Sequence, residues 1–242
     1  MTISIRIGNW LFKHAFPIYN RIYPLFKKKQ DQYELKLIDA CVKESDIVID
    51  IGANIGFYTA FLAQKVGKTG KVYAFEPDSE NFRRLKQNTR HLPQVIAVQA
   101  AVSNQNGVLK VYKSKMLNVD HRTYPVENAD TVEEIKCIAL DSFIPENEKP
   151  GFIKIDIQGF EFFAFQGMSK LIQRSESLHV ISEFWPEGLA KSGASADALL
   201  AFFQEHQLHV DIIDQNQRIP FDPQKMHALK GMDFLNLFLY KT

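Results

Sequence analysis

Cysteine is scarce in this chain. Only Cys41 and Cys137 occur among 242 residues, and each lies beside apolar residues, as buried thiols usually do. Two cysteines cannot build a disulfide scaffold, and free thiols are typical of proteins in a reducing compartment. We therefore expect a cytoplasmic protein whose fold depends on its apolar core.

A long apolar run and a strong net charge are also missing. No segment approaches the roughly 20 apolar residues of a membrane-spanning helix. Residues 1–30 contain no apolar stretch of the length that a signal peptide needs. The formal net charge is +1, whereas proteins that bind nucleic acid are usually strongly basic. We expect neither a transmembrane segment nor a nucleic-acid partner.

Acidic residues are absent from the first thirty positions. The basic residues there are Arg6, Lys13, Arg21, Lys27, Lys28 and Lys29, and aromatic residues are interleaved with them. We treat residues 1–30 as an N-terminal arm, irregular or helical, packed over a single domain of residues 31–242. The composition leaves open a second interpretation, in which the arm makes peripheral contact with a membrane surface or with an amphipathic substrate.

Apolar runs that read as buried strands alternate with helical patterns along the domain. These runs lie at residues 47–49, 71–75, 95–102, 152–156 and 178–183. Such alternation predicts an α/β fold with a mainly parallel sheet and helices on both of its faces. Two further runs, at residues 209–213 and 235–240, are predicted to pair antiparallel at the end of the chain.

The most informative segment is D-I-V-I-D-I-G-A-N-I-G-F-Y-T, residues 46–59. A buried strand ends there at Asp50, and the turn that follows contains Gly52, Asn54 and Gly56 before a helical pattern begins. Glycine allows the backbone to turn sharply and a ligand to approach it closely. Because ligands of open α/β sheets bind outside the carboxyl ends of the strands, this turn predicts a binding site.

The ligand indicated by this turn is cationic and carries no phosphate. A dinucleotide fingerprint would read G-x-G-x-x-G, but here Gly52 and Gly56 are separated by three residues. Asp50, two residues before the first glycine, would repel a phosphate. The next strand ends at Glu76, whose carboxylate can accept both hydroxyls of a ribose. Together these features favour S-adenosylmethionine.

A second group of polar residues provides candidates for a general base. Asp156 ends the strand in F-I-K-I-D-I-Q-G-F-E, Glu161 follows the turn after it, and Glu183 ends the strand in L-H-V-I-S-E. His121 belongs to the irregular segment 114–130 and has a side chain that titrates near neutrality. We therefore consider Asp156, Glu183, His121 and Glu161 as groups that could accept a proton from a hydroxyl.

In their order and spacing the motifs resemble the FkbM family of S-adenosylmethionine-dependent methyltransferases. The matching pieces are D-I-G-A-N-I-G-F-Y-T, Y-A-F-E-P, A-V-S, I-A-L-D-S-F, I-K-I-D-I-Q-G-F-E and the S-E at residues 182–183. The resemblance implies a class I, Rossmann-like methyltransferase fold with a seven-stranded, mostly parallel sheet and one antiparallel strand near its edge. It also implies methyl transfer to a hydroxyl of a sugar, a glycan or a natural product.

The same resemblance assigns parts of the cofactor to positions of this chain. It places Asp50, Gly52, Asn54 and Gly56 at the methionine end, Glu76 at the ribose, Ala101 and Val102 beside the adenine, and Asp156 below the sulfonium near the acceptor. Gln158 departs from the pattern, since many relatives carry a glutamate there. The product would be S-adenosylhomocysteine.

Other interpretations remain at this stage. Asp156 and Glu183 could together hold Mg²⁺, but Phe184 stands where a further ligand would follow, so a metal is not favoured. The chain could also be a cofactor-binding module without turnover or, with less support from the glycine spacing, a nicotinamide-dependent oxidoreductase. The identity of the acceptor and the oligomeric state have no signature in the sequence.

Overall fold

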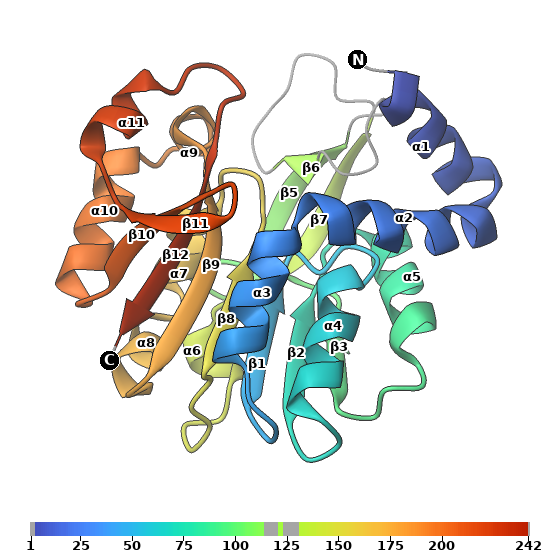
Figure 1. The fold of residues 1–242 in the computed structure, drawn as a ribbon, viewed down its shortest axis with the longest axis horizontal. Helices are drawn as coiled ribbons and strands as arrows, with labels where there is room; N and C mark the ends of the chain where they lie inside the picture. Colours follow the sequence, from blue (N-terminus) through green and yellow to red (C-terminus); the bar gives the residue numbers. More distant parts are fainter. Residues whose placement is uncertain (1–2, 114–120, 123–130, 242) are drawn as a thin grey trace.

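A computed structural model describes residues 3–113, 121–122 and 131–241, and its central element is an eight-stranded sheet (Figure 1). The strand order is β11-β10-β12-β9-β8-β1-β2-β3. The bounds are β1 Ile47–Ile51, β2 Lys71–Phe75, β3 Val95–Val98, β8 Phe152–Ile155, β9 Leu178–Phe184, β10 His209–Asp214, β11 Gln217–Pro220 and β12 Leu235–Lys241.

The sheet is mostly parallel, as the alternation of strands and helices predicted. Strands β3, β2, β1, β8 and β9 pair parallel in that order, and β12 pairs antiparallel with both β9 and β10. The predicted count of seven strands is one too low. The eighth strand, β11, folds back on β10 through a tight turn and extends the edge of the sheet.

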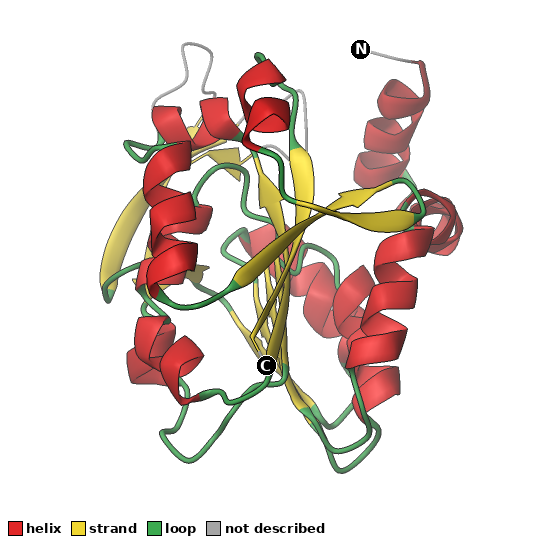
Figure 2. Ribbon diagram, turned by 60° about the vertical axis from the view of Figure 1, so that its left-hand side comes forward, coloured by secondary structure: helices red, strands yellow, loops and turns green. Residues whose placement is uncertain are grey.

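Helices cover both faces of this sheet, as the view in Figure 2 shows. Their bounds are α1 Ile3–His14, α2 Phe16–Gln30, α3 Gln32–Cys41, α4 Phe57–Val66, α5 Ser79–Thr89, α6 Leu140–Phe143, α7 Glu161–Gln166, α8 Ser169–Arg174, α9 Pro186–Lys191, α10 Ala196–Glu205 and α11 Pro223–Ala228. The apolar side chains of α3 and α4 cover one face, and those of α7, α8 and α10 cover the other.

Alternation along the strands decides which side chain enters which layer. Ile49 and Ile51 of β1 pack toward α7 and α8, whereas Val48 packs toward α3 and α4. On this second face the next inward positions are polar: Asp50 lies opposite Lys154 in the register of β1 and β8. The apolar layer under α3 and α4 therefore ends in charged side chains at the carboxyl edge of the sheet.

A second, four-stranded sheet stands above this edge and corrects one prediction. Its order is β4-β7-β5-β6, with β4 at Ala101–Val102, β5 at Gly107–Lys113, β6 at His121–Arg122 and β7 at Thr131–Ile138. The predicted single buried strand at residues 95–102 is thus two strands in two sheets. The chain leaves the first sheet after Val98, and β3 is only partly buried because it forms the sheet edge.

The N-terminal arm is helical and packs on the domain. Phe12 and Phe16 form a small buried cluster with Ile55 of the loop after β1. The side chains of Asn20 and Asn88 exchange two hydrogen bonds of 2.9 and 3.0 Å, and Asn88 also donates to the carbonyl of Ile55 over 2.8 Å. Through these contacts α2 is fixed beside the glycine turn and α5.

Within residues 3–113, 121–122 and 131–241, no helix combines the length and the apolar character needed to cross a bilayer. Both cysteines are free thiols, and Cys137 is buried.

Candidate active site

A cavity of about 810 Å³ lies at the carboxyl edge of the sheet. Its wall is formed by α2 and α3, the loop after β1, the tips of β2, β8 and β9, strand β4 and residues 232–236. Strand tips on both sides of β1 thus contribute to a single space. Its size falls within the range of about 300–1,000 Å³ that is usual for small-molecule sites.

The glycine turn forms part of the cavity wall, and its conformation depends on Gly52. This residue has a φ of 82°, and a Cβ placed on it would lie 2.0 Å from the backbone oxygen of Asp156. Only glycine allows the turn to pack so closely against the end of β8. Asn54 also has a positive φ, of 51°, and it lines the cavity.

Glu76 lies at the tip of β2 and faces the same cavity. Its Oε2 accepts the backbone N–H of Asn54 over 2.7 Å, and its Oε1 accepts that of Asp78 over 3.0 Å. Burial raises the pKa of Glu76 to about 7, although these two hydrogen bonds oppose the shift. The side chain of Asn81 donates a further hydrogen bond to this carboxylate, which still leaves lone-pair capacity for a ligand hydroxyl.

Asp50 and Gly56 lie behind the glycine turn, outside the cavity lining. Asp50 is buried and accepts a hydrogen bond of 2.6 Å from the hydroxyl of Thr59 in the first turn of α4. Burial raises its pKa to about 6. At Gly56, which has a φ of 90°, a Cβ would approach Leu85 of α5 to 2.8 Å. Asp50 and Gly56 therefore support the conformation of the turn from the side that faces away from the cavity.

Ala101 and Val102 are buried and line the cavity, but from an unexpected element. They form β4, which pairs parallel with β7 in the second sheet. With Phe75 they give this part of the cavity an apolar surface, the kind on which a flat aromatic base can lie.

Lys154 is a further site residue, in addition to those that the sequence motifs indicate. It is buried at an inward position of β8, and its ammonium lies 3.7 Å from Oδ2 of Asp156 and 4.9 Å from the centre of the Tyr58 ring. Although burial opposes it, the negative charge of Asp156 and other carboxylates raises the pKa of Lys154. The signal was present in I-K-I-D, where one charge interrupts an apolar strand.

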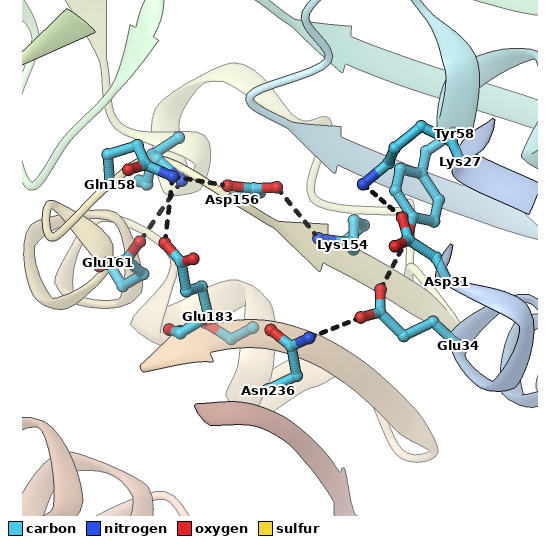
Figure 3. Close-up of polar contacts among 12 residues, drawn as sticks. Lys27, Asp31, Glu34, Tyr58, Lys154, Asp156, Gln158, Glu161, Glu183 and Asn236 are labelled. Carbon is cyan, nitrogen blue, oxygen red and sulfur yellow. Dashed lines mark hydrogen bonds and ion pairs between the residues drawn. The ribbon is translucent and has the colours of Figure 1, made fainter. Parts of the chain in front are cut away.

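The tips of β8 and β9 bring Asp156, Gln158 and Glu183 together, as Figure 3 shows. The amide of Gln158 donates to Asp156 over 3.4 Å and to Glu183 over 3.2 Å. Burial and the charge of Asp156 raise the pKa of Glu183 far above its usual range. This shift favours the protonated form of Glu183. The Asp156 side chain remains 43% exposed.

Glu161, another candidate base, does not join this group. Glu161 is fully buried; its Oε1 accepts the backbone N–H groups of Ile157 and Gly159 over 3.3 and 3.2 Å, which stabilises its own turn. It is not part of the cavity lining. His121 lies in β6 with its backbone opposite Lys113, and its side chain falls outside the described part of the structure.

Beside Lys154, hydrogen bonds link Tyr58 with residues at α3 and β12 (Figure 3). The hydroxyl of Tyr58 lies 2.7 Å from Asp31 and 2.7 Å from Glu34, and Asn236 donates to Glu34 over 2.7 Å. One hydroxyl proton cannot serve both carboxylates. Burial raises the pKa of Glu34, although the charges of Lys154 and Lys27 oppose the shift.

The described residues contain no group of three His, Cys, Asp or Glu side chains arranged to hold a metal ion. At the tips of β8 and β9, where we had considered Mg²⁺, the amide of Gln158 donates to both carboxylates.

Comparison with protein families gives a match to the methyltransferase FkbM domain over residues 50–209. Among curated proteins, the chain is 30% identical over 148 residues to the hexuronic acid methyltransferase AglP of Haloferax volcanii. This match covers 60% of the chain and 58% of the relative, so the chain spans less than two thirds of that protein's length.

Solved structures share the fold at low sequence identity. A methyltransferase FkbM from Methylobacillus flagellatus has a TM-score of 0.52 and 17% identity, with 81% of this chain and 43% of that chain covered. A putative methyltransferase from Streptococcus mutans, solved in complex with SAH, has a TM-score of 0.51 and 13% identity, with 87% and 97% covered. These likenesses establish the methyltransferase fold.

Proposed function

The chain belongs to the FkbM family of methyltransferases, whose methyl donor is S-adenosylmethionine, and from this premise we propose that it methylates a hydroxyl group of a sugar or sugar acid. The observation that carries the proposal is a shared cavity. The glycine turn and Glu76 line one part of it, and Asp156 and Lys154 line another. One space can therefore receive a methyl donor and a hydroxylated acceptor together.

The residues at the glycine turn fit S-adenosylmethionine. Gly52 leaves room where a Cβ would collide with Asp156, Glu76 offers carboxylate oxygens to the ribose, and Ala101 with Val102 offers an apolar surface to the adenine. When bound, S-adenosylmethionine supplies a methyl group activated by its positive sulfonium. The carboxylates in the lining suit this positive charge.

Asp156 is the group best suited to accept the proton of the acceptor hydroxyl. Its side chain is accessible from the cavity, and a positioned base of this kind contributes about 10²–10⁴-fold to a rate. Lys154 holds a positive charge beside it and stabilises negative charge that develops on the acceptor oxygen. The two side chains therefore act as a base and an electrostatic partner.

Glu183 and Gln158 would orient the acceptor. Because its raised pKa favours the protonated form, the carboxyl of Glu183 can donate a hydrogen bond to a sugar oxygen instead of removing a proton. Gln158 is held between the two acidic side chains by its amide. The polar groups on this side of the cavity match a substrate rich in hydroxyls, and the hexuronic acid methyltransferase relative supports a sugar as the acceptor.

The test is a screen of acceptors with the purified protein and S-adenosylmethionine. The panel contains uronic acid glycosides, neutral hexose glycosides, catechol and a nucleoside, and S-adenosylhomocysteine formation is measured. We expect product with a sugar acceptor, with the new methyl located on an oxygen by NMR. Methylation of nitrogen or carbon, or of catechol alone, would contradict the proposal.

Substitution of the base refines this test. Asp156→Asn should lower kcat by about 10²–10⁴-fold, while the affinity for S-adenosylhomocysteine measured by calorimetry changes far less. Asp39→Asn is the matched control, because Asp39 is exposed on α3 and lies outside the cavity. A protein that binds S-adenosylhomocysteine but turns over no acceptor would instead support the cofactor-binding module.

A further inference from the structure

Helix α2 carries an apolar stripe whose side chains are exposed instead of packed into the core of the domain. Ile18, Ile22, Leu25 and Phe26 are between 51% and 69% exposed. Their spacing of four, three and one residues places them on one face of the helix. The opposite face packs inward through Phe16 and its neighbours. Four large apolar side chains on one helix face exceed the scattered exposure that is normal for a surface.

This stripe continues across the mouth of the cavity. Ile22 and Phe26 line the cavity from α2, and Met232 and Phe234, which are 61% and 51% exposed, line it from the segment before β12. The indole N–H of Trp185 donates to the carbonyl of Gly231 over 2.6 Å and fixes that segment. We call Ile18, Ile22, Leu25, Phe26, Met232 and Phe234 the apolar rim.

The charge on α2 has one sign, whereas the segment that contributes Met232 and Phe234 carries both Lys230 and the exposed Asp233. Residues 1–30 contain no acidic residue, and Arg21, Lys28 and Lys29 are exposed on α2. Lys27 differs from them, because it turns inward and pairs with Asp31. An exposed apolar stripe flanked by Arg and Lys is the pattern of a helix that lies in the interface of an anionic membrane. A second copy of the chain would bring the same positive charges against each other.

We propose that the apolar rim docks on the surface of a bilayer that contains anionic lipid, with the mouth of the cavity facing the headgroups. The apolar side chains enter the boundary between headgroups and acyl chains, and the basic residues lie at the phosphates. If the chain methylates sugars, as proposed above, its acceptor is then a sugar carried by a lipid at that surface. The docking itself does not depend on methyl transfer.

The experiment is co-sedimentation of the purified full-length protein with vesicles. We compare pure phosphatidylcholine with phosphatidylcholine containing phosphatidylglycerol, at low and at high salt. The protein should sediment with the anionic vesicles, less so at high salt, and only weakly with the neutral ones. If it stays in the supernatant with anionic vesicles at low salt, the proposal is overturned.

Variants separate the apolar and the electrostatic contributions. Ile18→Asp with Leu25→Asp should weaken binding by about tenfold or more per side chain; neither residue lines the cavity. Replacing Arg21, Lys28 and Lys29 by Gln should weaken it by about fivefold per charge. Val108→Asp is the matched control, since Val108 is 64% exposed on β5 outside the rim. Thermal melts check that each variant folds.

The remaining outcomes are also decisive. Equal vesicle binding by the Ile18/Leu25 variant and the Val108 variant would show that the rim is not the docking surface. A dimer in light scattering that the Ile18/Leu25 variant converts to a monomer, without vesicle binding by the wild type, would assign the rim to contact between copies. Acceptor turnover without vesicle binding would refute the docking and leave the proposed function intact. Vesicle binding without turnover of any acceptor would support the docking and contradict the proposed function.

Discussion

At the scale of single residues, the carboxylate of Glu76 illustrates how burial prepares a group for a ligand. Its two backbone hydrogen bonds fix its orientation, while burial raises its pKa to about 7. Ribose hydroxyls that donate to the carboxylate favour its ionised form. Cofactor binding should therefore release protons near neutral pH and tighten as the pH rises from about 6 to 8.

The corresponding prediction concerns Glu76→Gln. Charge-assisted hydrogen bonds contribute about 1.5–3 kcal/mol each, so we expect the affinity for S-adenosylhomocysteine to fall by at least about tenfold and its pH dependence to flatten. Calorimetry in buffers of different ionisation enthalpy measures both effects. Glu80→Gln, on the exposed face of α5, serves as the control. An unchanged affinity and pH profile would remove Glu76 from the cofactor site.

Lys154 is the second residue whose role depends on its surroundings. The side chain is buried among carboxylates, and a neutral replacement leaves Asp156 without its nearest positive charge. Truncating one partner of a buried ion pair is costly because the other charge remains. We expect Lys154 to matter both for the fold and for the reaction.

We predict that Lys154→Met lowers kcat by about 10²-fold or more, the size of effect seen when one electrostatic donor is removed from an active site. Lys154→Arg should recover part of the rate, because the charge is kept. Steady-state kinetics and the affinity for S-adenosylhomocysteine distinguish this from simple unfolding. If Lys154→Met retains full kcat, the stabilisation assigned to the ammonium is wrong.

At the scale of elements, helix α2 forms one wall of the cavity, and mainly side-chain contacts hold this helix against the rest of the protein. Asn88 of α5 links the arm to the loop after β1 through hydrogen bonds to Asn20 and to the carbonyl of Ile55. The ring of Phe16 adds a contact, lying 3.7 Å from the Arg84 guanidinium. Loss of these contacts should release the arm while the sheet stays folded.

Asn88→Ala tests this attachment. The change removes polar partners from Asn20 and from the Ile55 carbonyl, which costs about 1–3 kcal/mol, so the arm should open more often. We expect faster tryptic cleavage after Arg21, Lys28 and Lys29 and weaker binding of S-adenosylhomocysteine. Gln87→Ala is the matched control, because Gln87 is exposed on the same helix. Identical cleavage rates in the two variants would show that Asn88 does not hold the arm.

At the scale of the whole molecule, burial of several carboxyl groups should shape the pH dependence of stability. The pKa of Asp50 is raised to about 6 and those of Glu76 and Glu161 to about 7. At a pH between the ordinary pKa of each carboxyl group and its raised pKa in the folded protein, the folded state holds a proton that the unfolded state has lost. The contribution of these groups to the free energy of unfolding is therefore largest below about pH 4, and it is lost as the pH rises toward 7.

Glu161 gives the clearest test, because it is fully buried and its Oε2 has no hydrogen-bond partner among the described residues. A shift from 4.5 to about 7 corresponds to about 3 kcal/mol lost between pH 4 and pH 8. Glu161→Gln cannot ionise, so its free energy of unfolding should fall less over this range. Urea unfolding at several pH values measures the difference. Parallel pH profiles for the variant and the wild type would contradict the assignment.

The local sequence determined the parts of this protein that depend on neighbouring residues. Apolar runs, glycine spacing and single carboxylates at strand ends predicted the parallel strands, the turn at Gly52 and the position of Glu76. Local chemistry also marks the start of α5, where the Asp78 side chain accepts the backbone N–H of Asn81. Periodicity and turn chemistry act over a few residues, and so they can be read along the chain.

Only the tertiary structure decided which distant residues meet. It moved Ala101 and Val102 into a second sheet and added β11 to the first. It placed Glu34 near the charge of Lys154 and joined Glu34 to Asn236 from the other end of the chain. It also turned one face of α2 inward and left the other exposed. These outcomes depend on packing between elements far apart in the sequence, which no local pattern encodes.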